Sequence, residues 1–196
     1  MDMKMDLRIR KTYRALTDAF IQMMQEMDFA DVTVNELCER SLVGRGTFYK
    51  HFADKYEFLS FLIRDQYGSF LSEISASMQH HSPYEFIAEL FRSCLDFLES
   101  SPALMSALKN AQGSSVIEKT VAEVLIPDMT QRMKEMKSMG YDIPFDPHLT
   151  AELAVSIGNQ TVLWWLRNRE SVPKEKFMSF LHRNVDALMS PGNSQK

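Results

Sequence analysis

Cysteine is scarce in this sequence, and its spacing excludes two large classes of small protein. The 196 residues include only Cys38 and Cys94. Two cysteines placed so far apart form neither a disulfide framework nor a zinc-binding motif. We therefore interpret both as small hydrophobic side chains of the interior, and we predict no metal site.

Long apolar runs are also absent. No stretch approaches the ~20 apolar residues that a membrane-spanning helix needs. The first residues are charged and are not followed by the apolar segment typical of a signal peptide. We expect a cytoplasmic protein with no membrane partner.

The residue patterns that carry catalysis are missing as well. The sequence has no glycine-rich phosphate-binding loop and no nucleophile elbow. Its five histidines are scattered, and the adjacent pair His80–His81 lacks a further ligand at metal-binding spacing. The sequence therefore predicts no catalytic residues and no cofactor, and it argues against an enzyme.

Glycine and proline are few, with seven of each, and alternating strand patterns are weak. Apolar residues instead recur at helical spacing along nearly the whole chain. This periodicity predicts an all-α protein. We expect about nine helices, at approximately residues 7–27, 34–40, 45–52, 55–78, 83–99, 102–110, 116–139, 147–169 and 173–189.

Residues 33–55 predict a helix, a tight turn and a second short helix. Thr33 followed three residues later by Glu36 is typical of a capping box at a helix start. Residues 41–44 form the predicted turn. One face of the first helix is apolar, through Val34, Leu37 and Cys38.

The second of these helices, at residues 45–52, has two different faces. Phe48 and Phe52 are four residues apart and face inward. The outer face is left with hydrogen-bond donors and cations: Arg45, Thr47, Tyr49, Lys50 and His51. Such a face suits phosphates and base edges, and a helix-turn-helix presents its second helix in that way.

The overall charge at first argues against a DNA-binding protein, because the formal net charge is −4 and the isoelectric point is about 5.8. DNA responds to the local field instead. Residues 45–55 contain three Lys or Arg against one Asp. A second basic cluster opens the chain, at Arg8, Arg10, Lys11 and Arg14.

These residues resemble the DNA-binding domain of the TetR family of bacterial transcription regulators. The resemblance covers roughly residues 8–60 and is carried by Thr33-Val34, by the run from Arg45 to Phe52, and by Asp54-Lys55. It implies a three-helix helix-turn-helix head at residues 1–53, continuing into the fourth helix to about residue 68. It also implies a larger helical body for ligand binding and dimerisation at residues 54–196.

Three positions depart from the family pattern. Leu42 stands where the turn usually has glycine, and Gly44 stands where the second helix usually has a serine cap. Asp28 replaces the usual glycine after the first helix. Leu42 is the costly substitution if its φ is positive, whereas glycine remains an acceptable cap.

Three residues at the start of the second helix are predicted to approach the bases. Arg45 is the candidate for base recognition, because arginine binds guanine bidentately. Thr47 is expected at a thymine methyl group or a phosphate. Gly46 allows close approach of the backbone.

The remaining candidates are predicted to bind the DNA backbone. Tyr49, Lys50 and His51 are expected to contact phosphates and set the register. Thr33 and Lys55 suit phosphate contacts from flanking positions.

The last two helices suggest how two copies of the chain associate. The eighth is apolar on almost every side, and the ninth has one apolar face. A single recognition helix contacts few base pairs, and two-fold dimers bind half-sites about 34 Å apart. Together with the family pattern, this predicts a homodimer through helices eight and nine and a palindromic double-stranded DNA operator.

The body is rich in methionine and aromatic residues, with 14 methionines in the chain. Such residues are typical of ordinary cores, and they also suit a cavity for a hydrophobic small molecule. The family resemblance implies a homodimeric repressor released from DNA by that ligand. The alternative is a TetR-like coactivator or adaptor whose body binds a partner protein. The sequence identifies no individual ligand contact; the aromatic and methionine side chains of the body include Phe86, Phe91, Phe97, Met105, Met129, Met133, Trp164 and Trp165.

Overall fold

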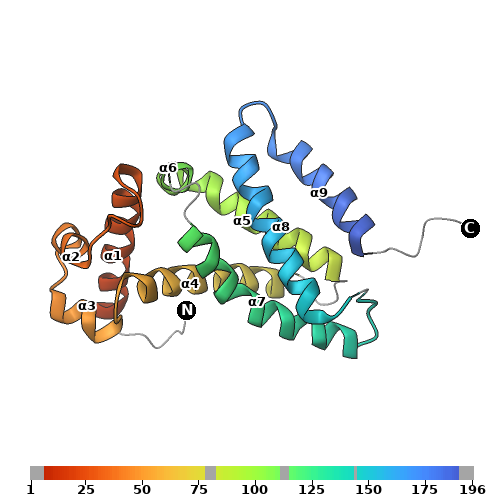
Figure 1. Cartoon of the computed structure of the whole chain (residues 1–196), viewed down its shortest axis with the longest axis horizontal. Helices are drawn as coiled ribbons and strands as arrows, with labels where there is room; N and C mark the ends of the chain where they lie inside the picture. The colour runs from red at the N-terminus through yellow and green to blue at the C-terminus, as the bar shows by residue number, and fades with distance from the viewer. Residues whose placement is uncertain (1–6, 78–82, 111–114, 144, 190–196) are drawn as a thin grey trace, which may run out of the picture. The chain divides into compact units, whose positions relative to one another are not determined.

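The computed structural model describes residues 7–77, 83–110, 115–143 and 145–189. All regular structure in these residues is α-helical, which confirms the predicted class (Figure 1). The bounds lie within one residue of those expected from the sequence. The helices are α1 (Leu7–Glu26), α2 (Val34–Ser41), α3 (Arg45–His51), α4 (Lys55–Ser77), α5 (Pro83–Ser100), α6 (Pro102–Asn110), α7 (Ser115–Ser138), α8 (Pro147–Asn168) and α9 (Lys174–Met189).

Some sequence predictions fall outside the described residues. These are the pair His80–His81 and the end of the fourth helix at residue 78. Within the described ranges, no helix has the length and apolarity required to cross a membrane. The same ranges contain no cluster of three or more side chains suited to hold a metal ion.

The chain forms two compact units. The first, unit 1, comprises residues 1–69 and 98–121, and the second, unit 2, comprises residues 70–97 and 122–196. Residues 98–121, which the sequence assigned to the body, thus belong to the same unit as the helix-turn-helix. Because α4, α5 and α7 each cross a unit boundary, the two units share three continuous helices.

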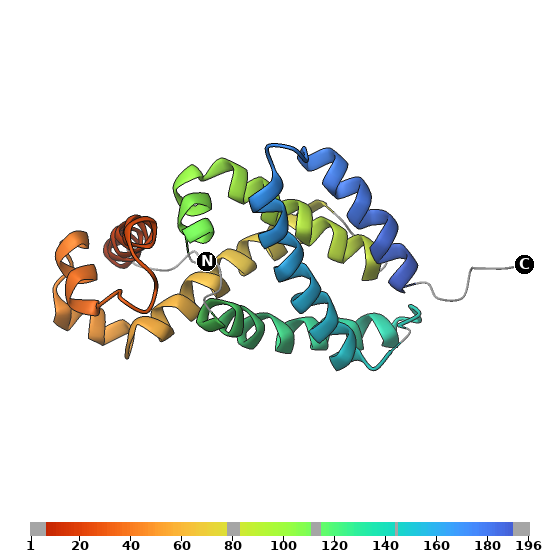
Figure 2. The ribbon, with the colours of Figure 1, turned by 45° about the horizontal axis from the view of Figure 1, so that its top comes forward.

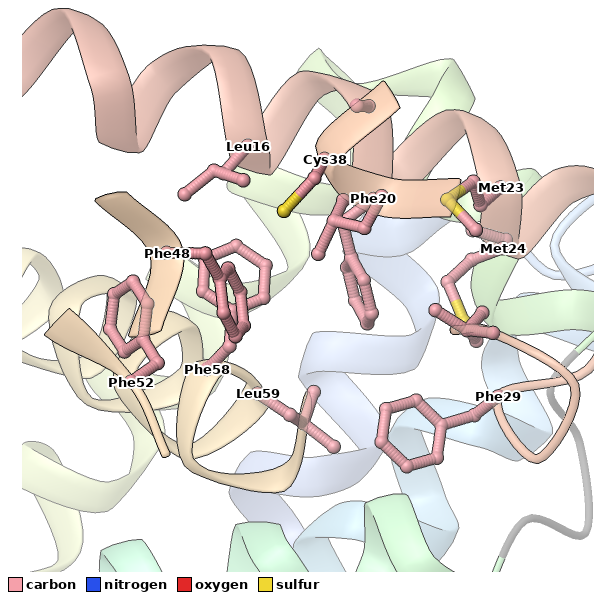
Figure 3. Close-up of a cluster of buried hydrophobic side chains, with 14 residues drawn as sticks. Leu16, Phe20, Met23, Met24, Phe29, Cys38, Phe48, Phe52, Phe58 and Leu59 are labelled. Atoms are coloured by element: carbon pink, nitrogen blue, oxygen red, sulfur yellow. The ribbon is translucent and has the colours of Figure 1, made fainter. Parts of the chain in front are cut away.

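Unit 1 is held together by an aromatic core. α1 packs against α2 and α6, and it contributes Leu16, Phe20, Met23 and Met24 to the interior. Figure 3 shows side chains from α1, α3 and α4 meeting in this core. Phe58 makes ring contacts with Phe20, Phe48 and Phe52 at centroid distances of 5.6, 6.0 and 5.0 Å. Edge-on contacts of this kind add to the free energy of burial and fix the position of α3.

Unit 2 has its own core, in which Phe86, Met129, Met133, Ile143 and Ala151 are buried. Figures 1 and 2 show α8 and α9 side by side, joined by a short loop. Three of their aromatic rings stack where they meet: those of Trp164, Trp165 and Phe177. The Trp165 indole N–H donates to the Val172 carbonyl over 3.1 Å, which closes the α8–α9 connection.

Gly158 permits close helix packing inside unit 2. A Cβ atom added to it would lie 2.6 Å from Cζ of Phe91. Heavy atoms do not approach so closely, so α8 contacts the Phe91 ring only because residue 158 has no side chain. Gly158 therefore allows α8 to pack closely against α5.

Candidate nucleic-acid interface

The first helix of the motif starts as its sequence predicts. The Thr33 hydroxyl oxygen accepts a hydrogen bond from the Glu36 amide over 3.2 Å. The other half of the capping box is not formed, because the Glu36 carboxylate accepts from Arg40 over 2.6 Å. Arg40 also pairs with Glu26 over 2.6 Å, which ties α2 to α1. Thr33 itself remains exposed, with a hydroxyl proton that can be donated to an anion.

The turn contains the strained backbone conformation that Leu42 at the usual glycine position made an open question. Leu42 has φ 56° and ψ 27°, and it is the only described residue other than glycine with a positive φ. Its amide donates to the Glu39 carbonyl over 3.3 Å, and the Val43 amide donates to the Cys38 carbonyl over 3.1 Å. These two hydrogen bonds define a Schellman motif, which usually has glycine at the left-handed position.

α3 begins without a side-chain cap. Gly44 is extended, and its carbonyl accepts the amides of Thr47 and Phe48 over 2.8 and 3.1 Å. Phe48 is fully buried and anchors the helix to the core. The five side chains predicted on the outer face divide into four that are exposed and His51, which is half-buried. Gly46 is exposed too, with nothing within 4 Å of the place a Cβ would occupy.

Arg45 is positioned by a residue that the sequence analysis did not identify. Its Nη1 donates to Oδ1 of Asn35 over 3.4 Å. The two side chains line a shallow depression between α2 and α3, of about 300 Å³, together with Cys38, Glu39 and Val43. The contact joins residues ten positions apart, and no local pattern indicates it.

Cys38 lines this depression as part of the core. Its side chain is buried. Burial raises the pKa of the thiol, and the nearby Arg45 opposes that change with a smaller effect. A thiol held in its protonated form is a poor nucleophile, which agrees with its interpretation as a small hydrophobic residue.

His51 contacts a side chain of α1. The Tyr13 hydroxyl lies 3.2 Å from Nδ1 of His51. The two rings are perpendicular, with centroids 5.3 Å apart. Tyr13 was not among the sequence candidates, because it precedes His51 by 38 residues and its place on α1 did not point to α3.

Lys55 makes an unexpected set of contacts within the protein. Its ammonium group donates to the carbonyls of Phe29, Ala30 and Val32 over 2.9, 2.7 and 2.8 Å. It also lies 4.9 Å from the centre of the Phe29 ring. These contacts join the start of α4 to the loop before α2. A phosphate contact by Lys55 would have to compete with three carbonyls, and it stays a prediction.

The described geometry thus presents donors on α3 and at the start of α2, over a rigid aromatic core. Arg45 offers a planar guanidinium, which matches both guanine and phosphate. Lys50 offers a point charge, and Tyr49 offers a phenol. No acidic side chain belongs to the exposed face of α3. Chemically, this surface suits a polyanion.

Comparison with known proteins finds relatives of this helix-turn-helix motif. The family model for bacterial regulatory proteins of the tetR family matches residues 16–60. The uncharacterized HTH-type transcriptional regulator YxbF of Bacillus subtilis (strain 168) is 30% identical over 108 residues, which are 55% of this chain and 26% of that protein. The match therefore spans about a quarter of the relative's length.

Solved structures resemble nearly the whole chain. A TetR-family transcriptional regulator from Syntrophomonas wolfei str. Goettingen superposes with a TM-score of 0.72 and 18% identity, over 92% of this chain and 95% of that chain. The regulator FadR of Bacillus subtilis, solved with stearoyl-CoA, gives a TM-score of 0.64 and 17% identity, over 91% and 98% of the two chains. At these identities the likeness establishes the fold.

Proposed function

We propose that this chain is a homodimeric repressor of the TetR family of bacterial regulatory proteins, which a hydrophobic small molecule releases from its operator. The observation that carries this proposal is the exposed face of α3, with its donors and cations and no acidic side chain. The match to the family model over residues 16–60 supports transcription regulation through a DNA-binding helix-turn-helix.

In this proposal α3 enters the major groove, and Arg45 recognises a base there. The contact between Arg45 and Asn35 supports this role, because it restrains a flexible side chain before DNA is bound. Tyr49, Lys50 and His51 bind phosphates. The exposed Thr33 hydroxyl binds a phosphate at the start of α2.

Gly46 and Thr47 complete the base-facing surface. Both are exposed, and Gly46 offers no side chain that would hold the backbone away from the groove. Lys55 is assigned to a neighbouring phosphate, in competition with its carbonyl partners.

A homodimer is supported by an apolar stripe that remains exposed in the single chain. Leu149, Leu153, Ile157 and Trp164 recur along one side of α8 and are 42–47% exposed. Phe180 adds an exposed ring on α9. Contiguous exposed apolar surface is typical of protein interfaces. We propose that the stripe packs against its own copy in a partner chain.

The proposed effector binds in unit 2. The core of unit 2 contains Phe86, Met129 and Met133, with Phe91 and Met136 packed against them. Methionine side chains adapt to ligands of irregular shape. Met105, which the sequence placed in the body, belongs to unit 1. The stearoyl-CoA complex of the structurally similar FadR supports a long acyl chain as the first ligand class to test.

Coupling between effector and DNA would pass along α4, which continues from unit 1 into unit 2. The ligand must bind the DNA-free state more tightly than the DNA-bound state. A difference of ~1–3 kcal/mol gives a 5- to 150-fold change in operator affinity.

Selection of bound duplexes from a random pool tests the DNA-binding proposal. We expect a palindrome with half-sites about one helical turn, or a multiple of it, apart. Ile157→Glu should produce monomers in light-scattering chromatography and weaken operator binding. Met139→Glu is the matched control, because it places the same charge on an exposed apolar residue outside the stripe. A non-palindromic site bound by monomeric wild-type protein would refute the dimer.

Titration of the operator complex tests the effector. Acyl-CoA thioesters of increasing chain length are added while DNA release is followed by fluorescence anisotropy. Release that strengthens with chain length supports the proposal. Release by a purified protein but by none of the small molecules would favour an adaptor.

A further inference from the structure

The side chains of Tyr13 and His51 form a contact that the proposed function does not use. Tyr13 comes from α1 and His51 from the last turn of α3. The phenol oxygen lies 3.2 Å from the imidazole Nδ1. The Tyr13 ring is fixed by Phe61 and Phe52, at centroid distances of 4.7 and 5.4 Å. Its hydroxyl therefore meets His51 from a packed and defined position.

A neutral imidazole has one nitrogen that donates and one that accepts, and the partner of one nitrogen sets the state of the other. If the phenol donates to Nδ1, the proton of His51 resides on Nε2. If Nδ1–H instead donates to the phenol oxygen, Nε2 exposes a lone pair, which repels a phosphate. Burial raises the pKa of Tyr13, so the phenol keeps its proton and remains available as a donor.

We propose that Tyr13 is a positioning residue for DNA binding, which holds neutral His51 in the tautomer whose Nε2–H donates to a backbone phosphate. The inference rests on the proposed phosphate contact of His51. It adds a residue from α1 to the recognition surface. Tyr13 acts through the imidazole and does not itself contact DNA.

The arrangement predicts when the Tyr13 hydroxyl matters. Without the phenol, Nδ1 of a neutral His51 has no donor, so the Nε2–H tautomer loses the hydrogen bond that stabilises it. The rings packed against His51 are those of Tyr13 from α1 and Phe52. The Tyr13 hydroxyl should therefore affect DNA binding only while residue 51 is histidine.

Tyr13→Phe tests this, because it keeps the ring and its packing and removes the hydroxyl. Binding of a defined 30-base-pair duplex is measured at low salt for full-length wild type and variant, with thermal unfolding as a check on folding. We expect a roughly 2- to 10-fold higher Kd at pH 8, as for the loss of one neutral hydrogen bond that stabilises the binding tautomer.

His51→Gln is the matched control. Its amide keeps a donor near the position of Nε2 and has no tautomer for the phenol to select. Tyr13→Phe should therefore have no further effect in the His51→Gln background. An equal loss in both backgrounds would mean that Tyr13 only supports packing, and it would overturn the proposal.

The result separates this inference from the proposed function. If His51→Ala binds like wild type, the phosphate contact fails and the inference fails with it. If His51→Ala weakens binding but Tyr13→Phe does not at pH 8, only the inference fails. Nitrogen NMR of wild-type protein on the duplex gives an independent answer, with the His51 signal identified by its loss in His51→Gln. An Nε2–H tautomer at pH 8 supports the proposal, and an Nδ1–H tautomer refutes it.

Discussion

The turn between α2 and α3 should become more stable when Leu42 is replaced by glycine. Leu42 has φ 56°, a conformation that costs an L-residue about 1–2 kcal/mol. Its side chain is 94% exposed, so its removal sacrifices almost no buried surface. Glycine removes this strain. It also costs about 0.5–1 kcal/mol, because a glycine backbone loses more conformational entropy on folding. Leu42→Gly should therefore stabilise the motif by roughly 0.5–1 kcal/mol.

The same chain provides an internal comparison for this magnitude. α7 ends in the same motif with glycine in place: Gly140 has φ 93°, its amide donates to Lys137 O over 3.1 Å, and Tyr141 N donates to Met136 O over 3.1 Å. An added Cβ at Gly140 would have nothing within 4 Å. Gly140→Ala should thus cost roughly 0.5–1 kcal/mol, because it adds the same backbone strain and recovers the same entropy.

Amide hydrogen exchange of residues 33–55 is the suitable assay. Both tryptophans lie in α8, so their fluorescence does not report on the turn. Since 1.4 kcal/mol corresponds to a factor of ten, Leu42→Gly should slow exchange in this segment about two- to fivefold. Leu42→Ala is the control, because it removes the side chain and keeps the strain. Equal slowing in Leu42→Ala and Leu42→Gly, or no slowing in either variant, would show that the positive φ of residue 42 does not destabilise the turn.

Four further substitutions test the interface and the packing. Arg45→Ala should weaken operator binding and relax preference at one base pair, whereas Lys50→Ala should weaken all sequences alike; selection and salt titration of each variant distinguish them. Lys55→Met should destabilise unit 1 by about 1–3 kcal/mol, because three carbonyls lose a charged donor; unchanged hydrogen exchange in unit 1 would leave phosphate binding as its only role. Gly158→Val should lower the unfolding midpoint, followed by tryptophan fluorescence, because overpacking costs about 1–3 kcal/mol. The matched control Gly68→Val, where an added Cβ meets nothing within 4 Å, should not.

The sequence predicted the helices well because their signals are local. Thr33 and Asp54 each sit one residue before a helix and accept hydrogen bonds from its first turn. The Schellman turn could also be anticipated from the sequence, because Leu42 at the usual glycine position already suggested a positive φ. Caps, turns and apolar periodicity involve residues within about four positions of each other.

The contacts that position the candidate site were not predictable in the same way. Asn35 contacts Arg45, Tyr13 contacts His51, and Lys55 contacts the loop at residues 29–32. Each joins residues that are ten or more positions apart. The assignment of residues 98–121 to unit 1 has the same cause, because α6 has an apolar face that could cover any partner.

These contacts suggest how the proposed DNA interface would divide affinity from selectivity. Ordering a flexible side chain on binding costs about 0.5–1.5 kcal/mol, and Arg45 and His51 have partners that reduce this cost before DNA arrives. A restrained donor is selective, because it binds only a base edge or phosphate whose acceptor atom matches its fixed position. The exposed Lys50 is an ammonium on a long flexible stem, and it can follow a phosphate through small changes in register. On this argument, variants that release the restraint, such as Asn35→Ala, should reduce the discrimination between operator and random DNA more than they reduce binding to random DNA.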